Sequence, residues 1–308
     1  MTPLFLAALF VLPARAYAGP TAEAGFGLAA QAFEQLQGVP APRLQPRHRA
    51  YRRNAYPYPA PFPVPGQPLC SQPVVWIDRQ GDIYKDNERL GSYAKEYKTS
   101  CSGDVAWTNS SREIYKNSER IGSYAAEFVI ALRTGDVAWK DSSNEIYRNS
   151  ERLGYYAADF QQSEWTGDVA WRSTSGELYK NGERLGYYAE SYRIARFSGG
   201  VGWRDRSGTI YRDGERLGYY AKSYQVTDYN GTVVWQDQSG NVYKNAERLG
   251  DYVQRWAVAA YSGDVIWIDG SRNIYKNAER LGSDARDFSV QPDGRGQWVD
   301  GSGRHYLL

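Results

Sequence analysis

The stretch GDVAWRSTSGELYKNGERLGYYA, residues 167–189, decides the fold because close variants of it recur along most of the chain. One tryptophan, the anchor, marks the same place in each copy: Trp76, Trp107, Trp139, Trp171, Trp203, Trp235, Trp267 and Trp298. The spacing of 31 or 32 residues gives seven nearly complete copies and an eighth that stops early. A fixed period of this length predicts a repeat architecture in which each copy is one supersecondary unit.

Turn signals divide one copy into four short extended pieces. In the copy at 188–218 we expect strands over 192–196, 201–204, 209–212 and 215–217. Between the last two lies Asp213-Gly214, and Asn or Asp opening a two-residue loop is typical of a β-hairpin. That loop length sets the register of the hairpin in every complete copy.

In the copy at 167–189 this register places Lys180 opposite Glu183, Tyr179 opposite Arg184, and Leu178 opposite Leu185. Cross-strand pairs of this kind stabilise a sheet by roughly 0.2–1 kcal/mol each. We therefore interpret the seven Glu-Arg dipeptides, from Glu88-Arg89 to Glu279-Arg280, as structural rather than as binding groups.

An aspartate follows two residues after most anchors and precedes a Ser-Gly type of turn. Its carboxylate is expected to accept the backbone N–H groups of that turn. The aspartates are Asp78, Asp141, Asp205, Asp237, Asp269 and Asp300. One carboxylate per turn supplies too few oxygen ligands for calcium, so we expect no metal here.

The composition favours an all-β protein without a catalytic centre. Aromatic residues make up 15% of the chain and there are 31 Gly, which suits many short strands and turns. A formal net charge of +2 gives no basic field for nucleic acid. With two Cys and two His, we expect no catalytic residues, no metal and no cofactor.

Four strands per 32 residues leave a β-propeller or a β-solenoid. Stacked coils of a solenoid would place Glu on Glu and Arg on Arg along the whole rod, which is costly. We therefore predict a propeller over residues 69–308, with 30 strands in eight blades whose terminal blades are incomplete. Seven blades is the alternative count, and the solenoid remains the alternative fold.

The first 68 residues differ from the repeats. Leu4 to Leu12 is apolar but too short to span a bilayer, and Ala16-Tyr17-Ala18 resembles a cleavage site, so we expect a signal peptide over 1–18 and no transmembrane segment. Residues 19–68 read as a Pro/Tyr/Arg-rich flexible segment with a possible short helix. Its arginines could contact a polyanion, although a solvated spacer is the plainer interpretation: Arg43, Arg47, Arg49, Arg52 and Arg53.

Export implies an oxidising compartment, periplasmic or extracellular. Cys70 and Cys101 both lie six residues before an anchor tryptophan. We expect them to form one disulfide, which requires equivalent points of adjacent copies to approach closely.

Two sets of aromatic residues outside the strict repeat are candidate ligand contacts, because exposed rings stack on the apolar faces of sugars. One set lies six residues before the anchors, and the other in the Gly-Tyr-Tyr-Ala copies. The candidates are Trp165, Phe197, Tyr229, Tyr261, Tyr155, Tyr187 and Tyr219. The alternative is that these rings cover blade interfaces, and Trp256 is expected in the core.

The repeat organisation and the anchor tryptophan resemble those of short-repeat secreted β-propellers, including lectin-like tectonin-type proteins. The resemblance implies a non-catalytic protein that binds glycans or cell-surface polymers outside the cytoplasm. The alternative is an envelope scaffold that binds a protein, and a glycoside-processing enzyme is a further candidate.

Overall fold

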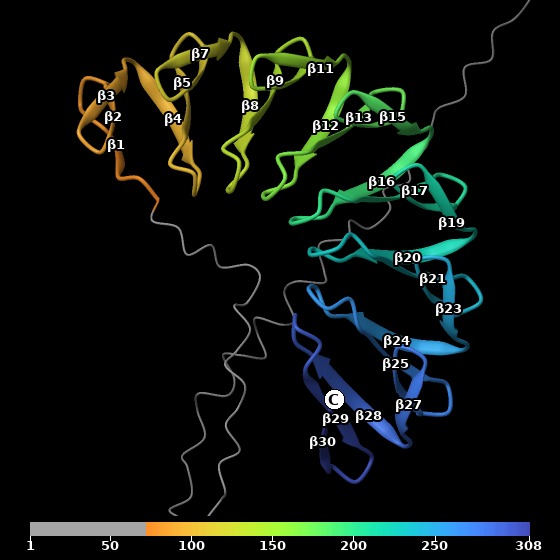
Figure 1. Ribbon diagram of the computed structural model, residues 1–308. Helices are drawn as coiled ribbons and strands as arrows, with labels where there is room; N and C mark the ends of the chain where they lie inside the picture. The colour runs from red at the N-terminus through yellow and green to blue at the C-terminus, as the bar shows by residue number, and fades with distance from the viewer. Residues whose placement is uncertain (1–71) are drawn as a thin grey trace, which may run out of the picture. The chain divides into compact units, whose positions relative to one another are not determined.

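The computed structural model describes residues 72–308, in which strands and turns are the only regular elements. Every described residue belongs to one unit of the chain, Pro59–Leu308. Within that unit, 30 strands form eight antiparallel sheets that follow one another along an arc (Figure 1).

Each complete sheet contains four strands in chain order, which we call the first to fourth strands. First strands are β4 (Ala94–Thr99), β8 (Ala125–Ile130), β12 (Ala157–Gln162), β16 (Ala189–Ile194), β20 (Ala221–Val226), β24 (Val253–Val258) and β28 (Ala285–Val290). Second strands carry the anchors: β1 (Val75–Ile77), β5 (Val105–Asn109), β9 (Val137–Asp141), β13 (Val169–Ser173), β17 (Val201–Asp205), β21 (Val233–Asp237), β25 (Val265–Asp269) and β29 (Gly296–Asp300).

The third and fourth strands of each repeat form its hairpin. Third strands are β2 (Ile83–Lys85), β6 (Ile114–Lys116), β10 (Ile146–Arg148), β14 (Leu178–Lys180), β18 (Ile210–Arg212), β22 (Val242–Lys244), β26 (Ile274–Lys276) and β30 (His305–Leu307). Fourth strands are β3 (Glu88–Gly91), β7 (Glu119–Gly122), β11 (Glu151–Gly154), β15 (Glu183–Gly186), β19 (Glu215–Gly218), β23 (Glu247–Gly250) and β27 (Glu279–Gly282).

The predicted all-β propeller fold is confirmed. Among residues 72–308, six sheets have four strands, while the first sheet shows no first strand and the last no fourth, which gives eight blades with incomplete ends. Strands pair within their own repeat, whereas in a solenoid they would pair between repeats. The chain passes from one sheet to the next on the convex side of the arc (Figure 1).

Each anchor tryptophan after Trp76 joins its own sheet to the preceding one. Trp203 stacks on Tyr211 of β18, with ring centroids 4.0 Å apart, and its indole N–H donates to Asp213 O at 2.7 Å. The outer edge of the ring lies over Gly186 of the preceding sheet, where an added Cβ would be 2.4 Å from the indole. Six further junctions repeat this contact, so the glycine that ends each fourth strand makes room for the next tryptophan.

The predicted hairpin register is confirmed at two of its three pairs. Lys180 lies opposite Glu183 and Tyr179 opposite Arg184, but Leu178 lies opposite Gly186 and not opposite Leu185. The predicted Leu178–Leu185 pair was wrong because a β-bulge inserts one extra residue in the fourth strand of each hairpin. The bulge brings the glycine to the place where the next tryptophan needs the space.

Two smaller expectations can be compared with the structure. The first strand predicted at 192–196 is β16, Ala189–Ile194, which begins earlier because Ala189 pairs with Asp205 across a second bulge. Trp256 is half-buried and packs against the cluster around Trp267, which confirms its place in the core.

The Glu-Arg dipeptides have a structural role, but with other partners than the register suggests. Arg184 pairs with Glu177 at 3.4 Å. The Lys180 ammonium group lies 3.6 Å from Asp213 and 3.7 Å from Asp168, so its ion pairs are with these two carboxylates and not with the cross-strand Glu183. The Glu of each dipeptide is exposed, and among the described residues it forms an ion pair only between Glu151 and Arg148, at 3.4 Å.

The predicted role of the turn aspartates is confirmed. Asp205 Oδ1 accepts the backbone N–H of Ser207 at 2.9 Å and of Thr209 at 2.8 Å. Burial alone would raise the pKa of Asp205, but the hydrogen bond from the Ser207 hydroxyl, at 2.7 Å, and those from the two N–H groups outweigh it and lower the pKa below its ordinary value. In the second repeat Asn109 takes the same place and accepts from Ser111 and Glu113.

The substitution Gly186→Ala tests the junction contact. Because the new Cβ would overlap Trp203, we expect a loss of about 1–3 kcal/mol in the free energy of unfolding, measured by urea denaturation. The matched control is Gly214→Ala, where the nearest atom to an added Cβ is Leu185 O at 4.0 Å. Equal effects of the two substitutions would contradict the close packing.

The turn aspartates predict an acid-sensitive fold. The pKa values of Asp205 and Asp269 are lowered in the folded protein, so the contribution of these two carboxylates to stability is present above about pH 4 and is lost as pH falls further. Melting temperatures measured from pH 7 to pH 2 should decline below pH 4. The double substitution Asp205→Asn and Asp269→Asn keeps an acceptor, as Asn109 does, and should reduce that decline; an unchanged decline would contradict the assignment.

Candidate functional site

A tyrosine occupies the turn between most neighbouring sheets in a backbone conformation that is unusual for its type. Tyr156 has a φ of 59°, and Tyr188 of 58°. The carbonyl oxygen of Tyr156 accepts a hydrogen bond from the backbone N–H of Thr174 at 2.8 Å. The next residue, Ala157, donates its N–H to the carbonyl oxygen of Asn144 at 2.8 Å. Turns of two successive sheets therefore hold the tyrosine in place, which keeps its backbone in the left-handed region.

Six consecutive junctions carry such a tyrosine, and we call these residues the junction tyrosines. They are Tyr93, Tyr124, Tyr156, Tyr188, Tyr220 and Tyr252, with φ between 54° and 62°. Their side chains are 64–78% exposed, so they contribute little to the core. A bulky residue in this region costs about 1–3 kcal/mol, whereas Gly or Asn would adopt it readily.

Three junctions have a second tyrosine directly before the first, and these were predicted as ligand contacts. Tyr155, Tyr187 and Tyr219 are 47–49% exposed. Arg152 lies over the ring of Tyr155 at 4.4 Å, and Arg184 over Tyr187 at 4.3 Å. Each ring lies 6.3–6.4 Å from the following junction tyrosine at a tilted angle. The prediction that these three bind a ligand stays a prediction.

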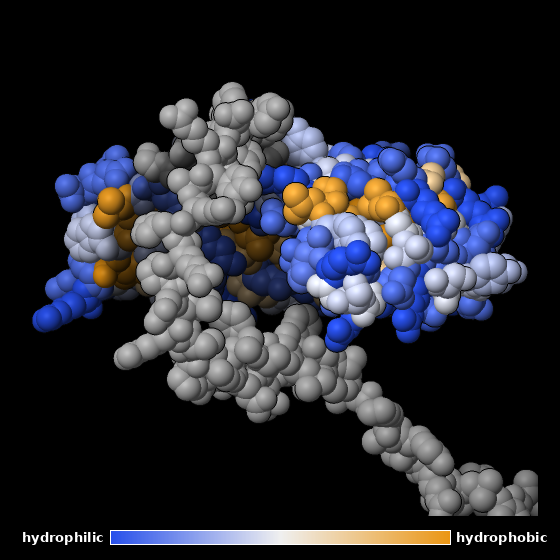
Figure 2. Space-filling model, turned by 90° about the horizontal axis from the view of Figure 1, so that it is seen from below, coloured by the Kyte–Doolittle hydropathy of each residue, from blue (hydrophilic) through white to orange (hydrophobic). Residues whose placement is uncertain are grey.

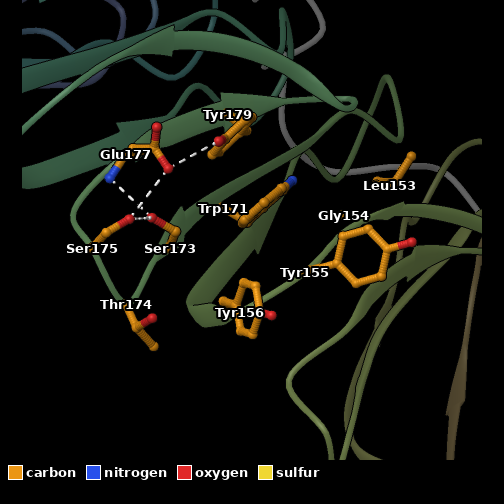
Figure 3. Close-up of a pocket in the computed structure, with 10 residues that line it drawn as sticks. All are labelled: Leu153, Gly154, Tyr155, Tyr156, Trp171, Ser173, Thr174, Ser175, Glu177 and Tyr179. Carbon is orange, nitrogen blue, oxygen red and sulfur yellow. Dashed lines mark hydrogen bonds between the residues drawn. The ribbon is translucent and has the colours of Figure 1, made fainter.

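A cleft of about 580 Å³ opens between the third and fourth sheets beside one of these pairs (Figure 3). Tyr155, Tyr156, Leu153 and Gly154 line it from one side. The other side is formed by the next repeat: Trp171, Ser173, Thr174, Ser175, Glu177 and Tyr179. The cleft thus combines two exposed phenol rings with hydroxyl and carboxylate groups.

The carboxylate of Glu177 is held by its own repeat. It accepts from Tyr179 Oη at 3.1 Å, Ser175 Oγ at 3.2 Å and Arg184 Nη1 at 3.4 Å. Burial of the Tyr179 hydroxyl is the main reason that its pKa is raised, and the hydrogen bond that it donates to Glu177 raises the pKa further. Glu177 is therefore a fixed hydrogen-bond acceptor at the wall of the cleft, and Thr174 is exposed at the other end of the same turn.

The other predicted contacts lie in loops at the concave side of the arc (Figure 1). Phe197 is 9% exposed and its ring lies 5.6 Å from Trp165, 6.2 Å from Tyr229 and 5.9 Å from Tyr261. The structure therefore brings these four residues into one cluster, which we call the inner-loop cluster. Tyr229 is 51% exposed, while burial of Phe197 favours a packing role for that residue.

Backbone hydrogen bonds connect the loops that carry this cluster. Trp165 N donates to Arg196 O at 3.1 Å, and Phe197 N to Asp228 O at 2.8 Å. Cys101 N donates in the same way to Leu132 O at 2.6 Å. Equivalent positions of neighbouring repeats are thus close, as a Cys70–Cys101 disulfide requires. Cys70 itself lies outside the described residues, so the disulfide stays a prediction.

Several predictions fall entirely outside the described residues. They are the signal peptide at 1–18, the segment at 19–68, and the polyanion contacts Arg43, Arg47, Arg49, Arg52 and Arg53. In the part that is described, no group of three or more His, Cys, Asp or Glu side chains is arranged to hold a metal ion. No helix in residues 72–308 is long and apolar enough to cross a membrane.

Sequence reasoning did not single out the junction tyrosines as candidates. They belong to the strict Gly-x-Tyr-Ala part of the repeat, which indicates a structural residue when read as sequence alone. A signal was present, because an aromatic residue stands where a turn residue such as Gly or Asn would be expected. Only the backbone conformation and the exposure separate them from the buried tyrosines.

The substitution Tyr188→Asn tests whether a junction tyrosine serves folding. Since Asn adopts a positive φ more readily and the ring of Tyr188 is exposed, we expect the free energy of unfolding to stay the same or rise by up to about 1 kcal/mol. Tyr211→Asn is the control, because it removes the ring stacked on Trp203 and should destabilise the protein by about 3 kcal/mol. A clear loss of stability in Tyr188→Asn would show a folding role.

No protein-family model matches this sequence, and no curated protein matches it significantly. Among solved structures, the chain is similar to the C-terminal WD40 domain of Sif2 (TM-score 0.31, 10% identity, 70% of this chain and 80% of that one). It is also similar to a eukaryotic initiation factor (TM-score 0.37, 9% identity, 75% of this chain and 82% of that one). A third similar structure is the Dos1 propeller (TM-score 0.30, 10% identity, 77% of this chain and 87% of that one). These likenesses concern the fold alone.

Proposed function

We propose that this protein is a non-catalytic, multivalent carbohydrate-binding protein whose ligand contacts are the junction tyrosines. The observation that supports this is a large aromatic side chain kept, six times, in an exposed and strained position where a turn requires only Gly or Asn. Strain of this kind persists where a side chain has a use other than folding.

The chemistry of the cleft suits a sugar. Phenol rings offer flat apolar faces on which the C–H faces of a pyranose can stack, and the tilt between Tyr155 and Tyr156 presents two such faces. Glu177 and Thr174 supply an acceptor and a hydroxyl for the sugar hydroxyls. A volume near 580 Å³ lies in the range of small-molecule sites.

Repetition would compensate for weak single sites. Three junctions carry a tyrosine pair and three more carry a single junction tyrosine, so one molecule offers several equivalent contacts. When several sites engage one polymer or cell surface, overall avidity can exceed the affinity of one site by about 10²–10⁴. Such binding is compatible with export, which also remains a proposal.

A protein partner is the second candidate. Exposed Tyr with Arg stacked on it, as in Arg152 over Tyr155, is the residue type that dominates binding energy at protein interfaces. The two candidates differ in ligand but share the contact residues, so one set of variants addresses both.

The triple substitution Tyr156→Asn, Tyr188→Asn and Tyr220→Asn tests the proposal. Immobilised plant, bacterial and animal polysaccharides are screened first, and binding is then followed by surface plasmon resonance. We expect the triple variant to lose about 10²-fold in avidity while it melts like the parent protein.

The matched control is Tyr229→Asn, which removes an exposed tyrosine from the inner-loop cluster and should leave glycan binding unchanged. If glycan binding is lost equally in the control, the site lies elsewhere. If the parent protein binds no glycan, the carbohydrate proposal fails and the protein-partner candidate replaces it.

A further inference from the structure

The first sheet has an open edge. It contains β1, β2 and β3, and the first strand present in every other blade is missing from it among the described residues. Asp86 N donates to Val74 O at 2.9 Å, so in the alternating antiparallel pattern Val75 and Ile77 direct their N–H and C=O groups away from β2. In residues 72–308, the group bonded to this edge is Tyr97 Oη, which donates to Val75 O at 3.0 Å.

The same sheet also leaves its anchor uncovered. Trp76 is 41% exposed, whereas the other seven anchors are 1–6% exposed. It stacks on Tyr84 as the others do on their tyrosines, at 4.2 Å, but lacks the first-strand residue that lies opposite each other anchor. Val74 beside it is 69% exposed, and hydrophobic surface is visible at this end of the unit (Figure 2).

A short distance before β1, the chain has a strict alternation of prolines. Pro57, Pro59, Pro61, Pro63 and Pro65 alternate with Tyr58, Ala60, Phe62, Val64 and Gly66. In an extended strand, residues two apart direct their N–H groups toward the same edge. One edge of such a strand would therefore have no donors, while the other would keep all of them, and proline is tolerated in sheets on just such an outer edge.

The register can be counted from the complete blades. In the fifth sheet Ala195 N donates to Gly200 O at 2.7 Å, so the N–H groups of Arg193 and Ser191 face β17, ten and twelve residues before Trp203. The same offsets from Trp76 give Gly66 and Val64, both of which have an N–H. Tyr192, which lies opposite Trp203, is eleven residues before it. The residue eleven before Trp76 is Pro65, so Pro65 would lie opposite Trp76.

We propose that residues 61–66 pair with β1 as the missing first strand of the first blade. Val64 and Gly66 donate to the open edge, Pro65 covers Trp76, and the outward prolines prevent further strands from adding. Residues before proline are already restricted to extended conformations, which lowers the entropy cost of ordering them. Val75 O can accept a second hydrogen bond beside that from Tyr97, because a carbonyl has two lone pairs.

The loop length is part of the proposal. In the second sheet Ser100 N donates to Asp104 O at 3.0 Å, and this loop is one residue shorter than in the fifth sheet. With the shorter loop Pro65 would occupy a donor position that it cannot fill. The alternation of prolines therefore selects the longer loop, which the third to seventh repeats use, whereas the eighth repeat has the shorter loop of the second.

Hydrogen–deuterium exchange of the Val75 and Ile77 amides in the full-length protein tests this pairing. Val64→Pro removes a donor that faces β1, whereas the matched control Gln67→Pro places proline nine residues before Trp76, where the N–H faces outward. We expect exchange at Val75 and Ile77 to rise about tenfold in Val64→Pro and to stay unchanged in Gln67→Pro. Exchange in β17 to β19 shows in both variants whether the rest of the fold is intact.

Two results would overturn the proposal. Equal exchange of the β1 amides in the parent protein and in Val64→Pro would mean that residues 61–66 do not pair with this edge. Protection that depends on protein concentration, together with a dimer in light scattering, would mean that a second copy covers it.

Discussion

The contact between each anchor tryptophan and the glycine of the preceding sheet is the constraint on which the rest of the structure depends. Trp203 can pack against Gly186 only because no Cβ is present there, and the β-bulge in the hairpin places that glycine in register. Each repeat therefore supplies a tryptophan to the junction before it and a glycine to the junction after it. Stability is then distributed over nearest-neighbour junctions, as in other repeat proteins.

The same junction fixes the geometry of the two sides of the arc. On the convex side the chain must turn sharply from one sheet to the next, and two turns hold a single residue in the left-handed region. On the concave side the loops approach closely enough to form hydrogen bonds between repeats, and their rings pack together around Phe197. Exposed rings remain available mainly on the convex side, which is why the proposed carbohydrate contacts lie there.

Most of the fold could be predicted from the sequence because the repeat is strict. The anchor spacing, the Asp-Gly and Asn-Gly loops and the turn aspartates indicate strand number, hairpin register and turn geometry. The bulge that moves Leu178 from Leu185 to Gly186 was not predictable from two-residue loops, since it arises from the tryptophan of the next repeat. Tertiary packing, not local pattern, determines that detail.

The candidate site was only partly predictable. Tyr155, Tyr187 and Tyr219 could be selected because they vary between copies, but the junction tyrosines beside them are nearly invariant within the chain and therefore looked structural. Phe197 shows the opposite case, because a residue in a variable loop is buried by the rings of neighbouring repeats. Exposure and backbone conformation are properties of the assembled junction and cannot be read from one repeat.

The most direct measurement is a glycan titration of the protein labelled with 3-fluorotyrosine, followed by fluorine NMR with each resonance assigned by single substitution. Resonances of the junction tyrosines, such as Tyr156 and Tyr188, should shift on binding, while that of Tyr211, stacked on its anchor, should not. Shifts confined to Tyr229 and Tyr261 of the inner-loop cluster would contradict a binding role for the junction tyrosines.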